Sequence, residues 1–160
     1  MFIQRSSQFK TSWSISGMAL VTAVDLGLHL DKGCTNKAQN EPKKRAMWCI
    51  YILDRSLCAS YGRQPLLKDE DTNLDLPHVL NYEIGTSDHL SVLYFTSMIK
   101  LYNIKGKIMK TVYSLRHVND IMAFKKTVAS MYSSLNQWLE TLPKECEYAR
   151  KEYISALTFS

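Results

Sequence analysis

Apolar residues recur every three or four positions along four long stretches of this chain of 160 residues. This spacing matches the roughly 3.6-residue period of an α-helix, and it differs from the strict alternation of a half-buried strand. The clearest stripe of this kind is Ile121, Phe124, Val128, Met131, Leu135, Trp138 and Leu142. Only six glycines and four prolines interrupt the chain. The sequence therefore predicts an all-α fold.

The four predicted helices cover residues 8–30, 40–62, 87–115 and 119–142, and an irregular loop follows the second helix. We expect Asn40 to cap the second helix and Gly62 to end it. Gly17 lies on the apolar stripe of the first helix, where we expect it to permit close approach of a neighbouring helix. The residues after Pro143 begin a further amphipathic segment. Residues 1–160 are thus predicted to form one multi-helix domain.

Asp54 lies on the apolar face of the second predicted helix, together with Met47 and Cys58. A buried carboxylate is costly unless it is paired or hydrogen-bonded. We therefore hypothesise that Arg55 or Arg63 pairs with a carboxylate, Asp54 being the first candidate, and that this pair holds the following loop against the helix. A ligand contact is the alternative role for Arg63.

The spacing of the cysteines predicts reduced thiols and an intracellular compartment, and the charges are unevenly distributed. The four cysteines show no C-x-x-C pair and no metal-ligand spacing, and we expect Cys49 and Cys58 to be buried free thiols. Basic residues dominate residues 91–139 and acidic residues dominate residues 66–88. We expect the two regions to compensate each other or to cover solvated helix faces, whereas attraction to nucleic acid is the alternative.

The sequence lacks the motifs of the common catalytic and metal sites. The acidic residues between 69 and 75 resemble the start of a calcium loop, but its required glycine and glutamate are replaced by Leu74 and Leu80. A terpene-synthase-type magnesium site would need a second acidic cluster facing the first. The basic run at residues 43–45 is weak evidence for direct DNA contact. No segment has the ~20 apolar residues that a membrane span needs. We expect no enzyme activity, no bound metal or cofactor and no membrane partner.

Several short motifs follow one another along the chain in a fixed order. The first are Trp13, Gly17-Met18-Ala19 and Leu26-Gly27-Leu28-His29, followed by Glu41, Lys44-Arg45, Trp48 and Asp54-Arg55. The later ones are Gly62-Arg63-Gln64-Pro65, which has one inserted residue, Leu76-Pro77, Leu135, Trp138-Leu139 and Leu142-Pro143. In this order they resemble the middle homology region, or fungal-specific transcription factor domain, of fungal binuclear zinc-cluster transcription factors.

The resemblance implies a regulatory domain, here a partial one, because the family's domain continues beyond its Leu-Pro motif. It implies control of RNA polymerase II transcription in the nucleus, through the transcription machinery or self-association and, in some members, through a small-molecule effector. Zinc and DNA contacts belong to a six-cysteine module that this chain lacks. A free-standing helical interaction or dimerisation module of the same origin is the alternative. The signature residues are Trp13, Gly17, Gly27, His29, Arg45, Trp48, Asp54, Arg55, Gly62, Arg63, Pro65 and Pro77.

Overall fold

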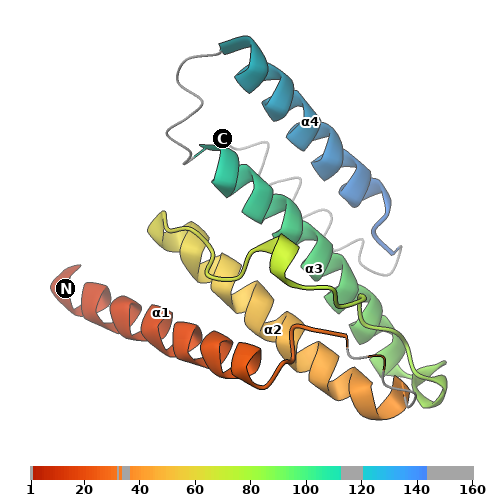
Figure 1. The fold of residues 1–160 in the computed structure, drawn as a ribbon. Coiled ribbons are helices and arrows are strands. Elements are labelled where there is room, and N and C mark those ends of the chain that lie inside the picture. Colours follow the sequence, from red (N-terminus) through yellow and green to blue (C-terminus); the bar gives the residue numbers. More distant parts are fainter. Residues whose placement is uncertain (1, 32, 34–36, 113–120, 144–160) are drawn as a thin grey trace.

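The computed structural model describes residues 2–31, 33, 37–112 and 121–143 (Figure 1). Its helices are α1 (Phe2–Asp25), α2 (Lys37–Tyr61), α3 (Ser87–Val112) and α4 (Ile121–Glu140). Two short 3₁₀-helices, η1 (Asp69–Asp71) and η2 (Asn81–Glu83), lie between α2 and α3. The described residues contain no strand, and the predicted all-α fold is confirmed.

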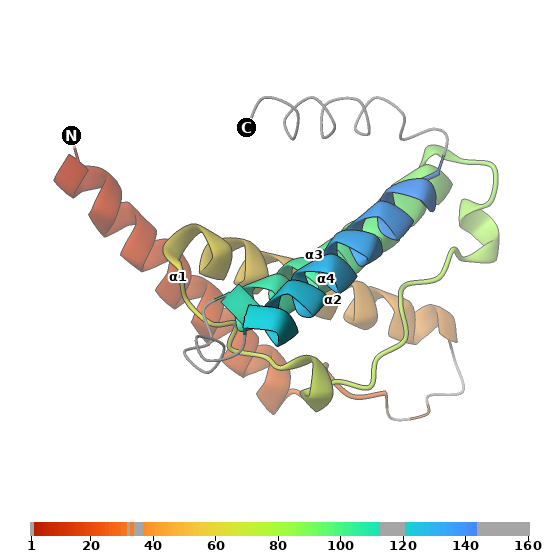
Figure 2. The same ribbon diagram turned by 90° about the horizontal axis from the view of Figure 1, so that it is seen from above.

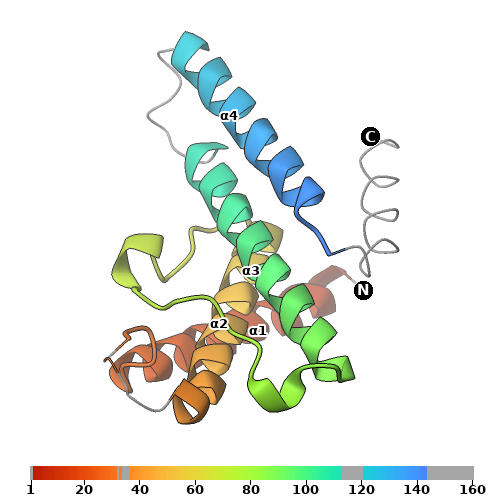
Figure 3. The ribbon, with the colours of Figure 1, turned by 90° about the vertical axis from the view of Figure 1, so that its right-hand side faces the viewer.

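Each helix packs mainly against the next one along the chain, α1 against α2, α2 against α3 and α3 against α4. Figures 1 and 3 show α4 beside α3, at the opposite end of this series from α1. Seen from above, α3 and α4 run along each other (Figure 2). Residues 62–86, here termed the return segment, run back along α2 before α3 begins (Figure 1).

The hydrophobic core lies where α1, α2, α3 and the return segment meet. Its buried residues are Leu20, Ala23, Met47, Trp48, Tyr51, Leu67 and Ile99. Helix α4 contributes none of these, although its own Trp138 is buried and donates an indole N–H to the carbonyl oxygen of Ser97 at 2.8 Å. The core therefore depends on the first three helices, and α4 is added on the outer side of α3.

Helix α1 ends at Asp25, five residues before its predicted end. Gly27 adopts a φ of 69°, a left-handed conformation that glycine reaches without a steric penalty. The Gly27 N–H donates to the carbonyl oxygen of Val24 at 2.8 Å, and the Leu28 N–H donates to that of Ala23 at 2.9 Å. This pair of bonds is the Schellman arrangement of a helix C-terminus. The Leu-Gly-Leu-His motif is therefore a helix stop.

Helix α2 begins at Lys37, so the predicted N-cap role of Asn40 is wrong. Pro42 lies inside the helix, which continues although this residue has no N–H to donate. The end of α2 agrees with the prediction, because Gly62 follows it with a φ of 62°. The Arg63 N–H then donates to the carbonyl oxygen of Cys58 at 2.9 Å, which closes the last turn.

Two further expectations need correction. A Cβ atom on Gly17 would lie 3.3 Å from Cδ1 of Leu66, so the close neighbour of Gly17 is the return segment and not another helix. Cys58 is buried as expected, but Cys49 is exposed because it lies on the opposite side of α2.

Helix α3 begins at Ser87 as predicted. The expected end of α3 at residue 115, the start of α4 at 119 and the segment after residue 143 lie outside the described residues.

Within the part of the chain that the structure describes, no helix is both long enough and apolar enough to cross a bilayer.

Candidate functional site

One side of α2 contacts the return segment along most of the length of the helix. The side chains involved recur at helical spacing, and because the segment runs antiparallel to α2 they contact it in reverse order. We call this set the α2 clamp: Glu41, Arg45, Trp48, Tyr51, Asp54 and Arg55.

Arg55 lies at the C-terminal end of the clamp, and only 2% of its surface is exposed. Its Nη2 atom donates to Oδ1 of Asp69 at 2.6 Å and to the carbonyl oxygen of Leu67 at 3.0 Å. The guanidinium carbon lies 3.4 Å from the centre of the Tyr51 ring. Nη1 is 3.6 Å from Oδ2 of Asp54. Arg55 thus pairs with carboxylates, as hypothesised, but its closer partner is Asp69 and not Asp54.

Asp54 is buried beside Arg55 and binds the return segment through its backbone. Its Oδ2 atom accepts the N–H of Leu66 at 3.1 Å, and the thiol of Cys58 lies 3.6 Å from Oδ1. Burial raises the pKa of Asp54, while the Leu66 N–H and the positive charge of Arg55 act in the opposite direction. Burial and the nearby carboxylate raise the pKa of Cys58 to about 11, so this thiol stays protonated and can donate to Asp54.

Tyr51 and Trp48 form the middle of the clamp. The Tyr51 hydroxyl donates to Oδ1 of Asp69 at 2.8 Å and accepts from Nδ2 of Asn103 at 3.2 Å, which connects the clamp to α3. Burial raises the pKa of Tyr51, so the hydroxyl keeps its proton. Trp48 packs edge-to-face on Tyr51 with 4.9 Å between ring centres, and its indole N–H donates to the carbonyl oxygen of Asp75 at 3.0 Å.

Arg45 closes the N-terminal end of the clamp. Its Nη1 and Nη2 atoms donate to the two carboxylate oxygens of Glu83 at 2.6 and 2.8 Å, and Nη2 also donates to the carbonyl oxygen of His78 at 2.8 Å. The His78 N–H donates to Oε1 of Glu41 at 2.8 Å. Glu83 in turn accepts the N–H of Leu80 at 2.7 Å. Fork-to-fork pairing of this kind adds directional specificity to the ionic attraction. Both ends of the return segment are therefore held by an arginine and a carboxylate.

The ion pair between Arg45 and Glu83 leads to a prediction of how the stability of the domain depends on pH. The hydrogen bond from Arg45 lowers the pKa of Glu83 from 4.5 to about 2. Because the folded-state pKa lies below the unfolded one, ionised Glu83 stabilises the fold above pH 4.5, and this contribution is lost as the pH falls towards 2. We expect Glu83→Gln to lower the melting temperature near neutral pH and to reduce the loss of stability in that acidic range.

Melting curves followed by circular dichroism over a pH series would check this expectation. Glu140→Gln is a suitable control because Glu140 is exposed at the end of α4, and this variant should keep the wild-type pH profile. An acid-induced loss in Glu83→Gln as large as in the wild type would mean that the Arg45–Glu83 pair does not cause it.

Further contacts connect the return segment to α1 and to the turn that follows it. Thr72 donates its hydroxyl to the carbonyl oxygen of His29 at 2.7 Å, and Oδ1 of Asn73 accepts the N–H of Asp31 at 2.7 Å. His29 therefore takes part through its backbone. The exposed side chain of Arg63 lies with its guanidinium carbon 4.2 Å from the centre of the Trp13 indole ring.

Gly106 of α3 lies close against Arg55, just as Gly17 lies close against the return segment. A Cβ atom on Gly106 of α3 would lie 3.2 Å from Nε of Arg55, so the missing side chain makes room for the guanidinium. Pro65 borders a small cavity of about 130 Å³ at the same place. Near the other end of the segment, the carbonyl oxygen of buried Pro77 accepts the hydroxyl of Thr96 at 3.4 Å.

The described residues contain no group of three His, Cys, Asp or Glu side chains that could hold a metal ion.

Comparison with known proteins identifies the family. The family model of the fungal specific transcription factor domain matches residues 1–140 of the sequence. The chain belongs to this family. The resemblance inferred from the order of the motifs is therefore confirmed. No solved structure matches the chain significantly.

The relatives of this transcription factor domain are much longer proteins. The chain is 27% identical over 154 residues to an ABC-transporter-regulating transcription factor of Aspergillus fumigatus, an alignment that covers 89% of the chain and 17% of the relative. It is 33% identical over 110 residues to a negative regulator of pleiotropic drug resistance of Candida glabrata, covering 66% and 10%. It is 27% identical over 157 residues to the pyrimidine pathway regulatory protein 1 of Saccharomyces cerevisiae, covering 84% and 17%. The chain thus spans less than a fifth of these relatives.

The signature residues of the domain fall into three groups in the structure. Arg45, Trp48, Asp54 and Arg55 meet the return segment as members of the α2 clamp, and Trp13 and Arg63 contact each other outside it. The remaining members lie where the backbone turns or passes close to a neighbour: Gly17, Gly27, His29, Gly62, Pro65 and Pro77. That these residues form a regulatory signature stays a prediction.

The sequence did not indicate the carboxylates that complete the clamp. Asp69 and Glu83 are separated from their arginine partners by 14 and 38 positions, so no local pattern connects them. The available signal was the excess of acidic residues between 66 and 88. Two of these acids pair with arginines of α2, whereas Glu70 pairs with Lys110 of α3 at 3.1 Å. Among the described residues, this last ion pair is the one that joins the two charged regions, so the expected compensation between them is limited.

Proposed function

We propose that this chain is a regulatory region, the middle homology region, of a zinc-cluster transcription factor. In this proposal it controls RNA polymerase II transcription in the nucleus through contacts with the transcription machinery and by sensing a small-molecule effector. It is not an enzyme, and it reaches DNA and zinc only through a separate module of the parent protein. The observation that carries the proposal is the family match over residues 1–140. The names of the relatives, which are transcription regulators, support it.

Two exposed apolar faces support a role in protein contacts. They lie on α1 and α4, at opposite ends of the series of helices, and their members are 58–76% exposed. They include Ile15, Met18 and Val21 on α1, and Ile121, Met122 and Tyr132 on α4. Contiguous exposed apolar groups on a soluble protein often mark interaction surfaces. The α2 clamp would serve this function by holding the intervening helices in one arrangement.

A reporter assay in yeast tests the proposed function. The chain is placed between a heterologous DNA-binding domain and an activation domain, and reporter output is compared with that of the same fusion without the chain. We expect the native chain to change the output, because a folded regulatory region restrains or recruits other proteins. Arg55→Ala should abolish the change by disrupting the clamp, whereas Arg63→Ala, on the surface, should preserve it. The same output from the native chain and Arg55→Ala, at equal protein levels, would contradict the proposal.

The alternative is a free-standing interaction or dimerisation module of the same family, and the apolar face of α4 favours it. The solution mass of the purified chain, measured by light scattering over a range of concentrations, separates the two functions. A dimer that dissociates in Tyr132→Asp, combined with no effect in the reporter assay, would favour the dimerisation module. A monomer that changes reporter output would favour the regulatory region.

A further inference from the structure

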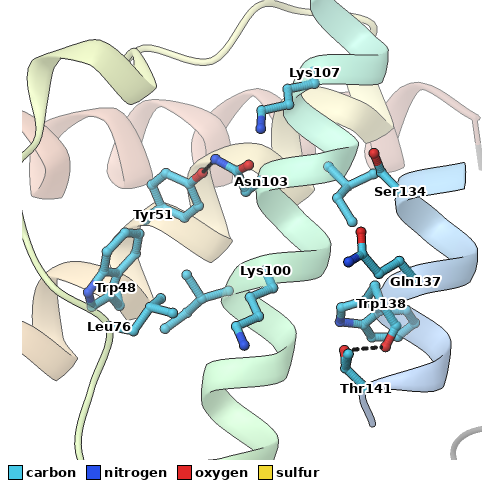
Figure 4. A pocket seen from close by; sticks show the side chains of 12 residues that line it. Trp48, Tyr51, Leu76, Lys100, Asn103, Lys107, Ser134, Gln137, Trp138 and Thr141 are labelled. Atoms are coloured by element: carbon cyan, nitrogen blue, oxygen red, sulfur yellow. Dashed lines mark hydrogen bonds between the residues drawn. The ribbon is translucent and has the colours of Figure 1, made fainter. Parts of the chain in front are cut away.

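A cavity of about 480 Å³ lies between α2, α3 and α4. Side chains of α3 lie in the middle of its lining, with Trp48 and Tyr51 of the α2 clamp on one side and side chains of α4 on the other (Figure 4). Small-molecule sites in proteins usually have volumes of roughly 300–1,000 Å³ and combine apolar walls with a few polar groups. The size and position of this cavity are therefore suited to a small organic ligand.

The charge of the cavity is positive. Lys100 and Lys107 line it from positions two turns apart on α3, with Asn103 between them (Figure 4). Among the described residues, no acidic side chain lines the cavity and neither lysine takes part in an ion pair. Lys110, further along the same helix, pairs with Glu70 instead. A concave surface with charge of one sign concentrates ligands of the opposite sign.

The apolar part of the cavity lining is aromatic and fixed in position. Trp48 and Trp138 are buried, and each donates its indole N–H to a backbone carbonyl oxygen, at 3.0 and 2.8 Å. Tyr51 is held by its hydrogen bonds to Asp69 and Asn103. Aromatic side chains restrained in this way need little further ordering when a ligand binds. They favour a ligand with a planar or aromatic body.

The wall formed by α4 adds neutral polar groups. Ser134 and Gln137 are exposed on this helix and line the cavity opposite the lysines (Figure 4). A hydroxyl and an amide can both donate to an anionic oxygen, and neither adds a charge of its own. They would therefore complete the coordination of an anion without opposing it.

We propose that this cavity binds an organic anion with a flat apolar body. The anionic group lies between Lys100 and Lys107, and the body packs against Trp48 and Trp138. Both lysines are exposed, so a neutral ligand would gain no ionic attraction from them, and a cation would be repelled. This inference rests on the proposed function, because the ligand would be the small-molecule effector of the regulatory region.

Two fluorescent probes of matched shape test the proposal on the full chain. Anilinonaphthalene sulfonate (ANS) is a flat aromatic anion, and N-phenylnaphthylamine is its analogue without the sulfonate. We expect the double variant Lys100→Gln/Lys107→Gln to raise the dissociation constant for ANS about tenfold, which corresponds to the loss of one charge-assisted contact. The dissociation constant for the neutral analogue should stay the same.

The double variant Lys125→Gln/Lys126→Gln is the matched control, since both lysines are exposed on α4 and neither lines the cavity. It should bind ANS as the wild type does. Ser134→Trp should fill the cavity and abolish binding of ANS at this site. Melting curves would verify that each variant is folded.

Three results would overturn the proposal: an unchanged dissociation constant for ANS in Lys100→Gln/Lys107→Gln, an equal rise for the neutral analogue, or undiminished ANS binding in Ser134→Trp. The reporter assay separates this failure from failure of the proposed function. Output that still depends on an intact Arg55 would leave the regulatory role in place while the anion site is rejected.

Discussion

Arg55→Ala should lower the free energy of unfolding by about 3–5 kcal/mol, which is the range found when one partner of a buried ion pair is removed. The substitution leaves Asp54 buried and Asp69 partly buried without their shared cation. It also removes the hydrogen bond to the carbonyl oxygen of Leu67 and the packing on the Tyr51 ring. Urea denaturation followed by circular dichroism measures the change in the free energy of unfolding.

Arg63→Ala is the matched control, because the two arginines lie on either side of the same turn and both belong to the predicted signature. Arg63 is exposed, and its contact with the Trp13 ring should contribute only about 0.5–1 kcal/mol. Arg55→Lys keeps the charge but loses the planar guanidinium, so it should recover only part of the stability. If Arg55→Ala and Arg63→Ala lowered the free energy of unfolding equally, burial of the Arg55 ion pair would not explain its contribution to stability.

Asp54→Ala should lower the free energy of unfolding by about 2–3 kcal/mol, because it leaves a part-buried N–H group without its charged acceptor. The group concerned is the N–H of Leu66, and Nη1 of Arg55 also loses its nearby carboxylate. Asp54→Asn should cost less, because the amide oxygen can still accept from Leu66. The effect should be smaller than that of Arg55→Ala, since Asp69 remains as the closer partner of Arg55.

Asp75→Ala is the control for Asp54→Ala. Asp75 is exposed in the return segment, and its contact with Trp48 uses the backbone carbonyl oxygen and not the side chain. Substitutions at exposed positions such as this one usually change the free energy of unfolding by less than about 0.5 kcal/mol. A melting temperature that is the same for Asp54→Ala and the wild type would contradict the role of Asp54 in holding the return segment.

The parts of this fold that depend on local periodicity could be predicted from the sequence. The four helices follow from their stripes, and Asp54 was noticed because a carboxylate is costly on an apolar face. The end of α1 could not be predicted in the same way, because apolar residues continue at helical spacing through Leu26 and Leu28 although Gly27 already turns the chain. Periodicity describes one face of a helix but not where the hydrogen bonding stops.

Contacts between distant parts of the chain were the least predictable. The sequence suggested that Arg55 pairs with a carboxylate, but not that Asp69 lies nearer to it than the adjacent Asp54. Similarly, Gly17 indicated a close approach without indicating that Leu66 would be the neighbour. These details depend on how the return segment lies against α2, and that arrangement is set by many tertiary contacts at once.

The position of α4 outside the core has a consequence for local unfolding. Free energies of opening differ between the elements of one protein, and elements with few buried apolar contacts open first. Helix α4 contributes none of the core residues, whereas α2 contributes three of them and the whole clamp. Separation of α4 from α3 would therefore require less free energy than disruption of α2. Since α4 forms one wall of the cavity, the cavity can widen by this motion while α2, which carries the clamp, remains folded.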